Sequence, residues 1–186
     1  MKIGVHAGHN PDGKRACGAI GIIKESTENR RVKDELISLL KKEGHIVYDC
    51  TVENGTSVSD IVNKQVRNSN SHDLDLTVSI HFNSGASDAN GNNQTTGTEV
   101  LVYNKTGEKA NIAARVCERI SKLGYKNRGV KVRTNLGFLS KTKAPAILVE
   151  CCFVDDKDDI NKYNYKTMAK AIAEGILNKT IATSTT

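Results

Sequence analysis

Residues 146–149 spell Ala-Ile-Leu-Val, an unbroken apolar run that is followed directly by Glu150. Such a run is typical of a strand in a parallel sheet, because that kind of sheet is covered on both faces. Residues 74–81 predict a second strand, since apolar and polar side chains alternate along them until His81. Together the two segments indicate an α/β fold in which each of these strands ends in a residue with acid–base or metal-binding chemistry.

On either side of these segments, stretches whose apolar residues have the spacing of a strand alternate with stretches whose apolar residues have the spacing of a helix. Residues 25–43 predict a helix, because their leucines recur at helical spacing and Gly44 follows where a C-terminal cap belongs. Further strands are predicted at 2–6, 45–50 and 98–103, and further helices at 57–66, 109–123 and 168–176. The order predicts a single α/β domain, with a twisted, mostly parallel sheet of about six strands and helices on both faces.

The length and composition also indicate one folded unit. The chain has 186 residues, of which 38% are hydrophobic, and this is enough for one core. We expect the domain to cover residues 1–179, and residues 180–186 to begin a polar linker toward a further module. Residues 83–97 are rich in Ser, Asn, Gly and Thr, so they predict a mobile surface loop.

The chain is basic, with 27 lysines and arginines against 21 acidic residues and a formal net charge of +6. This charge favours anionic partners without choosing among nucleic acids, acidic polymers and membrane surfaces. Because tryptophan is absent and there are three phenylalanines, the surface on which single-stranded nucleic acids stack is nearly missing, and we expect no nucleic-acid partner. No window of about 18 apolar residues occurs and no signal-peptide region follows Met1, so we expect no stable membrane insertion.

The five cysteines are scattered through the chain and odd in number. Neither a disulfide framework nor a structural zinc site has this pattern, so we expect reduced, mostly buried thiols in a protein made in a cytoplasm. Cys151 and Cys152 follow Glu150, but no histidine lies near them in the sequence to activate a thiol. We therefore do not expect a catalytic cysteine.

Three of the predicted strands are followed by, or end in, groups that bind metals or move protons. His9 follows the first strand, His81 ends another, and Glu150 ends the apolar one. The carboxyl ends of parallel strands share one edge of the sheet, where ligands bind. The helix after the first strand also begins at that edge, and its first turn carries Glu25 and Glu28. Two imidazoles and two or three carboxylates should therefore converge there.

Two histidines and one carboxylate are a ligand set for catalytic zinc, and a further carboxylate can take a proton from the metal-bound water. The spacing alone leaves Glu25 and Glu28 open as the third ligand, because both lie on the stripe that leads into the apolar face of the helix. The alternative is a basic α/β domain with structural histidines and no metal. Each residue taken singly fits that alternative, and the convergence favours the metal site.

Several short motifs, in their order and spacing, resemble the zinc-dependent N-acetylmuramoyl-L-alanine amidases of bacterial autolysins and phage endolysins. The resemblance covers residues 1–178. The matching stretches are Ala7-Gly8-His9, Gly18-Ala19-Ile20-Gly21, Lys24-Glu25, Ser79-Ile80-His81-Phe82-Asn83, Gly97-Thr98-Glu99, Asn127-Arg128-Gly129-Val130-Lys131 and Pro145-Ala146-Ile147-Leu148-Val149-Glu150.

The resemblance implies that His9, Glu25 and His81 hold one zinc ion and that Glu150 is the catalytic carboxylate. Glu25 is favoured over Glu28 because it follows a lysine, as in the family, and lies nineteen residues before Gly44. Two further residues, Asn83 and Arg128, are predicted to contact substrate.

The function implied is hydrolysis of peptidoglycan at the amide bond between N-acetylmuramic acid and the L-alanine of the stem peptide. Zinc-bound water would be the nucleophile and Glu150 the general base and acid, and the outcome would be lysis of the bacterial wall. Two alternatives remain: a zinc peptidase that cleaves within the stem peptide, and a wall-binding module without catalysis.

In lacking a signal peptide, the chain most resembles the endolysins of phages of Gram-positive bacteria. By that likeness the protein is made in the host cytoplasm and acts on the cell wall. Residues 1–179 would then be a zinc amidase domain, and the linker would lead to a C-terminal wall-binding module. We expect this domain to be a monomer, since no apolar stripe is left over for a partner.

Overall fold

The structure, a computed structural model, describes residues 1–182. Its strands are β1 (Lys2–Ala7), β2 (Ile46–Asp49), β3 (Leu76–Asn83), β4 (Thr98–Val102), β5 (Asn127–Val132) and β6 (Ala146–Phe153). Its helices are α1 (Glu25–Lys42), α2 (Val58–Asn70), α3 (Glu108–Ser121), α4 (Gly137–Lys141), α5 (Lys157–Lys162) and α6 (Tyr165–Leu177). Every segment predicted as a strand or helix from the sequence is confirmed within a few residues.

The six strands form one sheet in the order β2-β1-β3-β6-β4-β5. Strands β1, β2, β3 and β6 are parallel to one another, whereas β4 runs antiparallel to β6 and β5 runs parallel to β4. The prediction of a mostly parallel sheet is therefore confirmed. The carboxyl ends of β1, β3 and β6 lie at one edge, and the start of β4 lies at the same edge because that strand is reversed.

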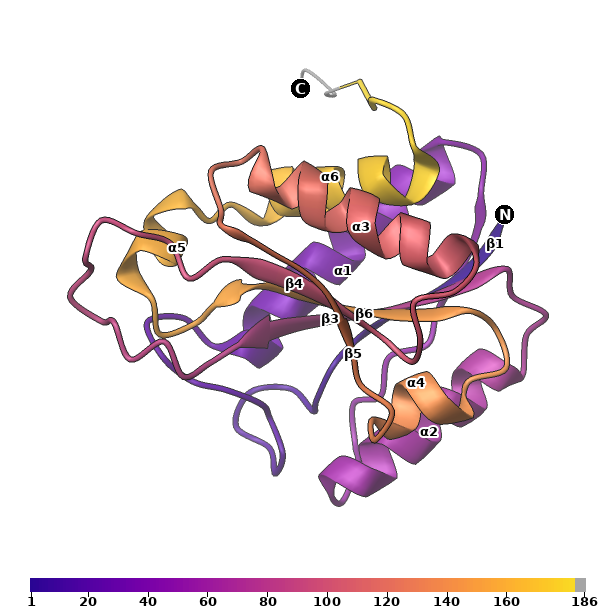
Figure 1. Cartoon of the computed structure of the whole chain (residues 1–186). Helices are drawn as coiled ribbons and strands as arrows, with labels where there is room; N and C mark the ends of the chain where they lie inside the picture. Colours follow the sequence, from indigo (N-terminus) through magenta and orange to yellow (C-terminus); the bar gives the residue numbers. More distant parts are fainter. Residues whose placement is uncertain (183–186) are drawn as a thin grey trace.

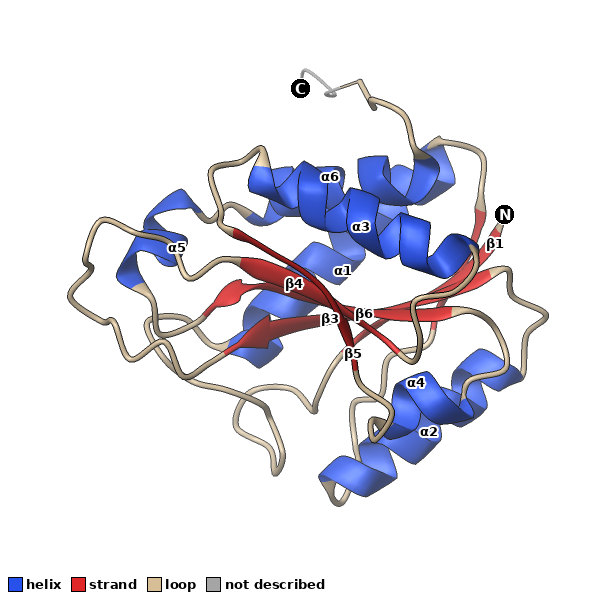
Figure 2. Ribbon diagram, in the orientation of Figure 1, coloured by secondary structure: helices blue, strands red, loops and turns tan. Residues whose placement is uncertain are grey.

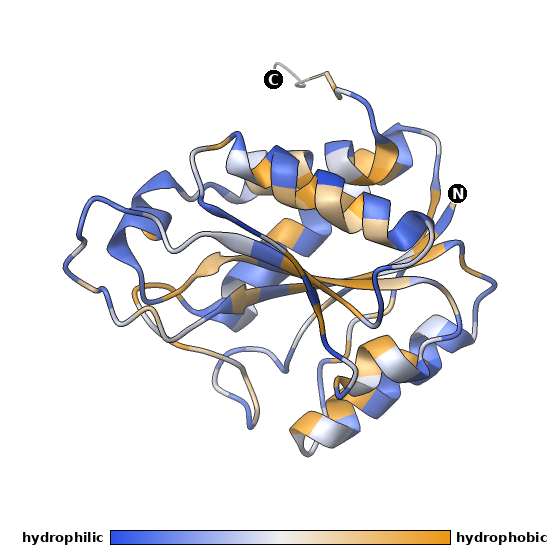
Figure 3. Cartoon of the chain, viewed as in Figure 1, coloured by the Kyte–Doolittle hydropathy of each residue, from blue (hydrophilic) through white to orange (hydrophobic). Residues whose placement is uncertain are grey.

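Helices cover both faces of the sheet, as predicted (Figures 1 and 2). Helices α1, α3 and α6 pack together on one face, where a large core forms against the apolar side chains of the strands. Helices α2 and α4 lie on the other face over a smaller core, which includes Leu101, Phe138 and Leu148. In Figure 3 the hydrophobic residues gather on the strands and alternate with hydrophilic ones along the helices, as expected for amphipathic helices.

The ends of the first two helices follow from their sequence. Helix α1 ends just before Gly44, whose φ of +84° is a left-handed conformation that glycine adopts without steric cost. Helix α2 begins after Ser57, whose side chain accepts a hydrogen bond from the Asp60 amide at 3.1 Å. The cap at Gly44 was expected from the sequence.

Three elements were not predicted: the edge strand β5 and the short helices α4 and α5. The segment predicted as a mobile loop joins β3 to β4, and its amides donate hydrogen bonds to the side chains of Asp155, Asp156 and Asp158. Within the expected linker, Ile181 is buried against the domain, and residues 183–186 lie outside the described residues. No helix in the described part of the chain combines the length and apolar character needed to cross a membrane.

Candidate metal centre and catalytic site

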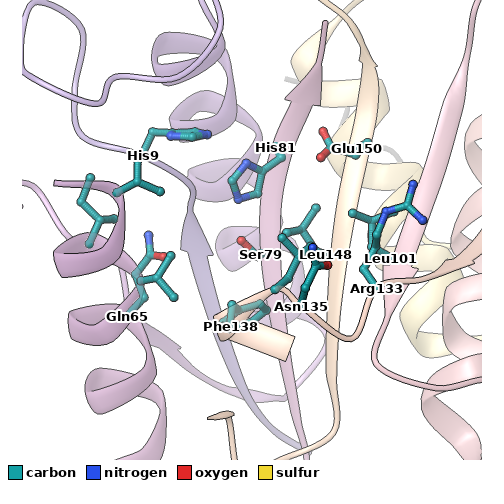
Figure 4. A pocket seen from close by; sticks show the side chains of 15 residues that line it. His9, Gln65, Ser79, His81, Leu101, Arg133, Asn135, Phe138, Leu148 and Glu150 are labelled. Carbon is teal, nitrogen blue, oxygen red and sulfur yellow. The ribbon is translucent and has the colours of Figure 1, made fainter. Parts of the chain in front are cut away.

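The site lies at the edge of the sheet where β1, β3 and β6 end. His9 follows β1, and His81 on β3 stands directly beside Glu150 on β6, because these two residues are partners in the strand register. Figure 4 shows His9, His81 and Glu150 along one end of a pocket on the α2 and α4 side of the sheet. The predicted convergence of these three residues is therefore present in the fold.

Glu25, the first residue of α1, lies between the two histidines. One carboxylate oxygen lies 3.0 Å from Nδ1 of His81, and the other lies 3.5 Å from Nε2 of His9. The amides of Phe82 and Ala19 donate to the same two oxygens, at 3.1 and 2.8 Å. The carboxylate is almost fully buried and fixed at both oxygens, so its orientation is set by the fold.

Glu28 lies elsewhere. Its carboxylate pairs with Arg31 at 3.1 Å and accepts a hydrogen bond from the hydroxyl of Tyr163 at 2.9 Å. Of the two acidic residues in the first turn of α1, the structure therefore groups Glu25 with the histidines.

The backbone next to the first histidine is shaped for this cluster. Gly8 lies so close to the His81 ring that any Cβ atom there would collide with it. The Gly8 carbonyl accepts a hydrogen bond from the buried Asn29 side chain at 2.9 Å. His9 itself has a φ of +63°, and its carbonyl accepts a hydrogen bond from Arg30 at 3.0 Å. The surrounding structure thus holds His9 in a conformation that a non-glycine residue adopts at a cost.

The donor atoms of His9, Glu25 and His81 all lie within 4.8 Å of one another, close enough to bind one ion. Two imidazole nitrogens and one carboxylate oxygen are the donor set of a catalytic zinc site, which keeps its fourth position open. The three residues therefore fit a zinc ion.

The charges of this cluster are coupled. Burial opposes protonation of His81, but its hydrogen bond with Glu25 and the negative charges of Glu25 and Glu150 together outweigh burial and raise the pKa of His81. Burial and the neighbouring His81 lower the pKa of His9. Burial opposes ionisation of Glu25, but hydrogen bonding and charge interaction with His81 outweigh it, and the pKa of Glu25 is lowered. Glu25 is thus held as a carboxylate, the form that binds a metal.

Glu150 is in a different environment. Its Oε2 atom is buried and has no hydrogen-bond partner among the described residues. Burial raises the pKa of Glu150 to about 7, and the nearby carboxylates of Glu25 and Glu99 act in the same direction. A carboxyl group with a pKa near neutrality can both accept and return a proton, which general acid–base catalysis requires.

The two residues predicted to contact substrate lie next to Glu99, the partner of Glu150 on β4. Arg128 donates to the Glu99 carboxylate at 2.9 Å, and the side chain of Asn83 donates to its other oxygen at 3.3 Å. Arg128 therefore balances part of the negative charge of Glu99 beside Glu150. The role of Asn83 and Arg128 toward substrate stays a prediction.

A cavity of about 380 Å³ begins at His9, His81 and Glu150 and extends between the sheet and helices α2 and α4. Its walls include Leu101, Leu148 and Phe138, while Arg133 lies beyond the end of β5. None of the residues of the 83–97 loop lines it. No sequence motif pointed to residues 133–138, because α4 is too short to show a helical period.

Burial argues against a thiol nucleophile. Cys151 and Cys152 are fully buried on β6, and burial raises the pKa of both thiols well above its usual value. All five cysteines are free and four of them are buried, with Cys17 partly exposed, so the expectation of free, mostly buried thiols is confirmed.

Comparisons with known proteins agree on one family. A family profile described as N-acetylmuramoyl-L-alanine amidase matches residues 3–180. An uncharacterized protein of Clostridium perfringens is 38% identical over 185 residues, which cover 97% of this chain and 53% of that protein. The endolysin of Bacillus phage SPP1 is 30% identical over 182 residues, covering 91% of this chain and 60% of its own length.

Among solved structures, the catalytic domain of the CD27L endolysin targeting Clostridia difficile superimposes with a TM-score of 0.86. It shares 30% sequence identity, and the match covers 98% of this chain and 99% of that domain. The chain spans about half the length of the curated Clostridium perfringens relatives it matches, 53% in each case.

Proposed function

The chain belongs to the N-acetylmuramoyl-L-alanine amidase family, and from this premise we propose that it is a zinc-dependent hydrolase of bacterial peptidoglycan. The bond cleaved is the amide between N-acetylmuramic acid and the L-alanine of the stem peptide. The observation that carries the proposal is the grouping of His9, Glu25 and His81 beside the strand-paired Glu150. The similarity to a phage endolysin and to an endolysin catalytic domain supports the cell wall as the site of action.

His9, Glu25 and His81 would hold the zinc ion. When bound there, zinc supplies Lewis-acid activation of the attacking water and of the scissile carbonyl. The protein's part is to fix this geometry: the amides of Ala19 and Phe82 hold both oxygens of Glu25, and Gly8 gives the His81 ring room.

Glu150 moves the proton. Its carboxylate accepts the proton of the attacking water as the new carbon–oxygen bond forms, and then donates it to the alanine nitrogen as the carbon–nitrogen bond breaks. The raised pKa of Glu150 suits both steps, because one group must hold the proton between them. The products are a glycan with a free lactyl carboxylate and a stem peptide with a free amino terminus.

The test is to digest purified peptidoglycan and analyse the fragments by mass spectrometry. We expect intact stem peptides and unshortened glycan strands. Peptide fragments cut inside the stem would show a zinc peptidase instead, and sedimentation with walls without release of fragments would show a binding module.

Two variants complete the experiment. Glu150→Gln should keep bound zinc and fold but lower turnover by about 10²–10⁴-fold, the usual contribution of a positioned acid–base group. Glu28→Gln is the matched control, because Glu28 bonds Arg31 and Tyr163 instead of the cluster, and it should retain activity. Near-normal turnover in Glu150→Gln would contradict the assignment of Glu150.

A further inference from the structure

The pocket beside the metal site has two different halves. One end carries Glu150 and two of the proposed zinc ligands, His9 and His81, and the other is bounded by the apolar side chains of Leu101, Leu148 and Phe138. These three residues belong to the small core under α2 and α4, so the pocket wall is part of a packed interior and keeps its shape. Figure 4 shows His9 and Gln65 on one side of this pocket and Leu101 with Arg133 on the other.

Arg133 is the only lysine or arginine among the described residues that line this pocket. Its backbone is anchored just past the end of β5, where its amide donates to the carbonyl of Val102 at 2.9 Å, and the residue is exposed. One guanidinium nitrogen donates to the Val132 carbonyl at 3.1 Å. No ion pair of Arg133 occurs within residues 1–182, whereas Arg128 on β5 is paired with Glu99. The guanidinium therefore has hydrogen-bond donors left for an anionic group.

The two buried polar side chains of the pocket wall, Gln65 and Ser79, are already engaged with the protein, whereas the exposed Asn135 makes no side-chain hydrogen bond within residues 1–182. The Gln65 amide nitrogen donates to the carbonyl of Ala7 at 3.0 Å, and the Ser79 hydroxyl lies 3.4 Å from Nδ1 of His6. A sugar ring needs several free donors and acceptors for its hydroxyl groups, and this wall offers few. Small apolar groups fit the leucine and phenylalanine surface, and a carboxylate fits the guanidinium, which can bind both of its oxygens.

Resting on the proposed function, we propose that this pocket receives the peptide side of the substrate and that Arg133 binds a free carboxylate of the stem peptide. Alanine methyl groups would lie against Leu101, Leu148 and Phe138, and the scissile amide would reach the site next to Glu150. Arg133 is then the residue that makes the enzyme prefer stem peptides with free carboxylates over amidated ones.

The test uses the full chain loaded with zinc and two synthetic substrates. One is an N-acetylmuramoyl tripeptide with free carboxylates, and the other is the same compound with every carboxyl group converted to a carboxamide. We expect wild-type protein to prefer the free acid by about tenfold in kcat/KM, mainly through a lower KM. A factor of this size is what one charge-assisted hydrogen bond contributes to binding. Arg133→Gln should abolish this preference, and Arg133→Lys should restore part of it.

Arg67→Gln is the matched control, because Arg67 is exposed on α2 and lies outside the pocket lining. It removes the same charge and should leave the preference intact. Equal cleavage of both substrates by wild-type protein, or a preference that survives in Arg133→Gln, would overturn the inference while leaving the proposed function standing. If wild-type protein cleaves neither substrate, the proposed function fails and the inference fails with it.

Discussion

Gly18 lies against two of the proposed metal ligands, so replacing it by alanine should weaken zinc binding. A Cβ atom at Gly18 would lie 2.8 Å from Cδ2 of His9 and closer still to a carboxylate oxygen of Glu25. Carbon atoms pack at about 3.5–4.0 Å, so at least one ligand must move by several tenths of an ångström or more. Displacing groups that orient metal ligands typically costs about 10–100-fold in metal affinity, and we expect a loss in that range.

The backbone contributes a second effect that a control can separate. Gly18 has a φ of +82°, where a residue with a Cβ atom costs about 1–2 kcal/mol. Gly13 has a φ of +79° and nothing within 4 Å of the added Cβ, so Gly13→Ala imposes similar strain without touching a ligand.

The assay is competition for zinc with a chromogenic chelator, together with thermal unfolding of the zinc-free proteins. Both variants should lose stability, but only Gly18→Ala should lose zinc affinity by tenfold or more. Equal zinc affinities in Gly18→Ala and Gly13→Ala would refute the assignment of His9 and Glu25 as ligands held by this contact.

Three further predictions concern the framework and the pH response. Asn29→Ala removes a buried 2.9 Å hydrogen bond to the Gly8 carbonyl and should lower the free energy of unfolding in urea by about 1–3 kcal/mol. Burial lowers the pKa of His6 from 6.5 to about 3, so the unfolded chain binds the proton first as pH falls. Unfolding free energy should therefore drop by up to about 1.4 kcal/mol per pH unit below 6.5, and His6→Phe should flatten that slope in urea titrations. Turnover on peptidoglycan should rise with pH as Glu150 loses its proton. The midpoint of this rise should lie at or below the Glu150 pKa of about 7, because a nearby zinc ion favours the carboxylate. A rate that falls as pH approaches 7 would contradict the role of Glu150 as the base.

The parts of the fold that the sequence predicted are those with strong local periods. Strand β6 is apolar throughout its first half, and in β3 the alternation of side chains places His81 on the same face as Ser79. Strand β5 was missed because it lies at the edge of the sheet, and its sequence, Asn-Arg-Gly-Val-Lys-Val, has only two apolar side chains and contains a glycine. Helices α4 and α5 have five and six residues, too few for a helical period to appear.

Residue patterns alone predicted the site to the level of the sheet edge, and the choice of Glu25 over Glu28 came from the family resemblance. Glu25 and Glu28 share the first turn of α1, and what separates them is contact with distant segments. The amide of Phe82 bonds Glu25, and Tyr163, 135 residues away in the sequence, bonds Glu28. The position of Arg133 on the pocket likewise depends on how β5 pairs with β4, which no local pattern specifies.

The most direct test of the account is the zinc content of purified protein, measured by mass spectrometry for wild type, Glu25→Gln and Glu28→Gln, alongside hydrolysis of peptidoglycan with and without a chelator. We predict about one zinc per chain in wild type and Glu28→Gln, far less in Glu25→Gln, and hydrolysis that follows the zinc. Wild-type protein that hydrolyses the substrate without zinc, or a Glu25→Gln variant that keeps the full zinc content, would contradict the proposal that His9, Glu25 and His81 form the catalytic metal site.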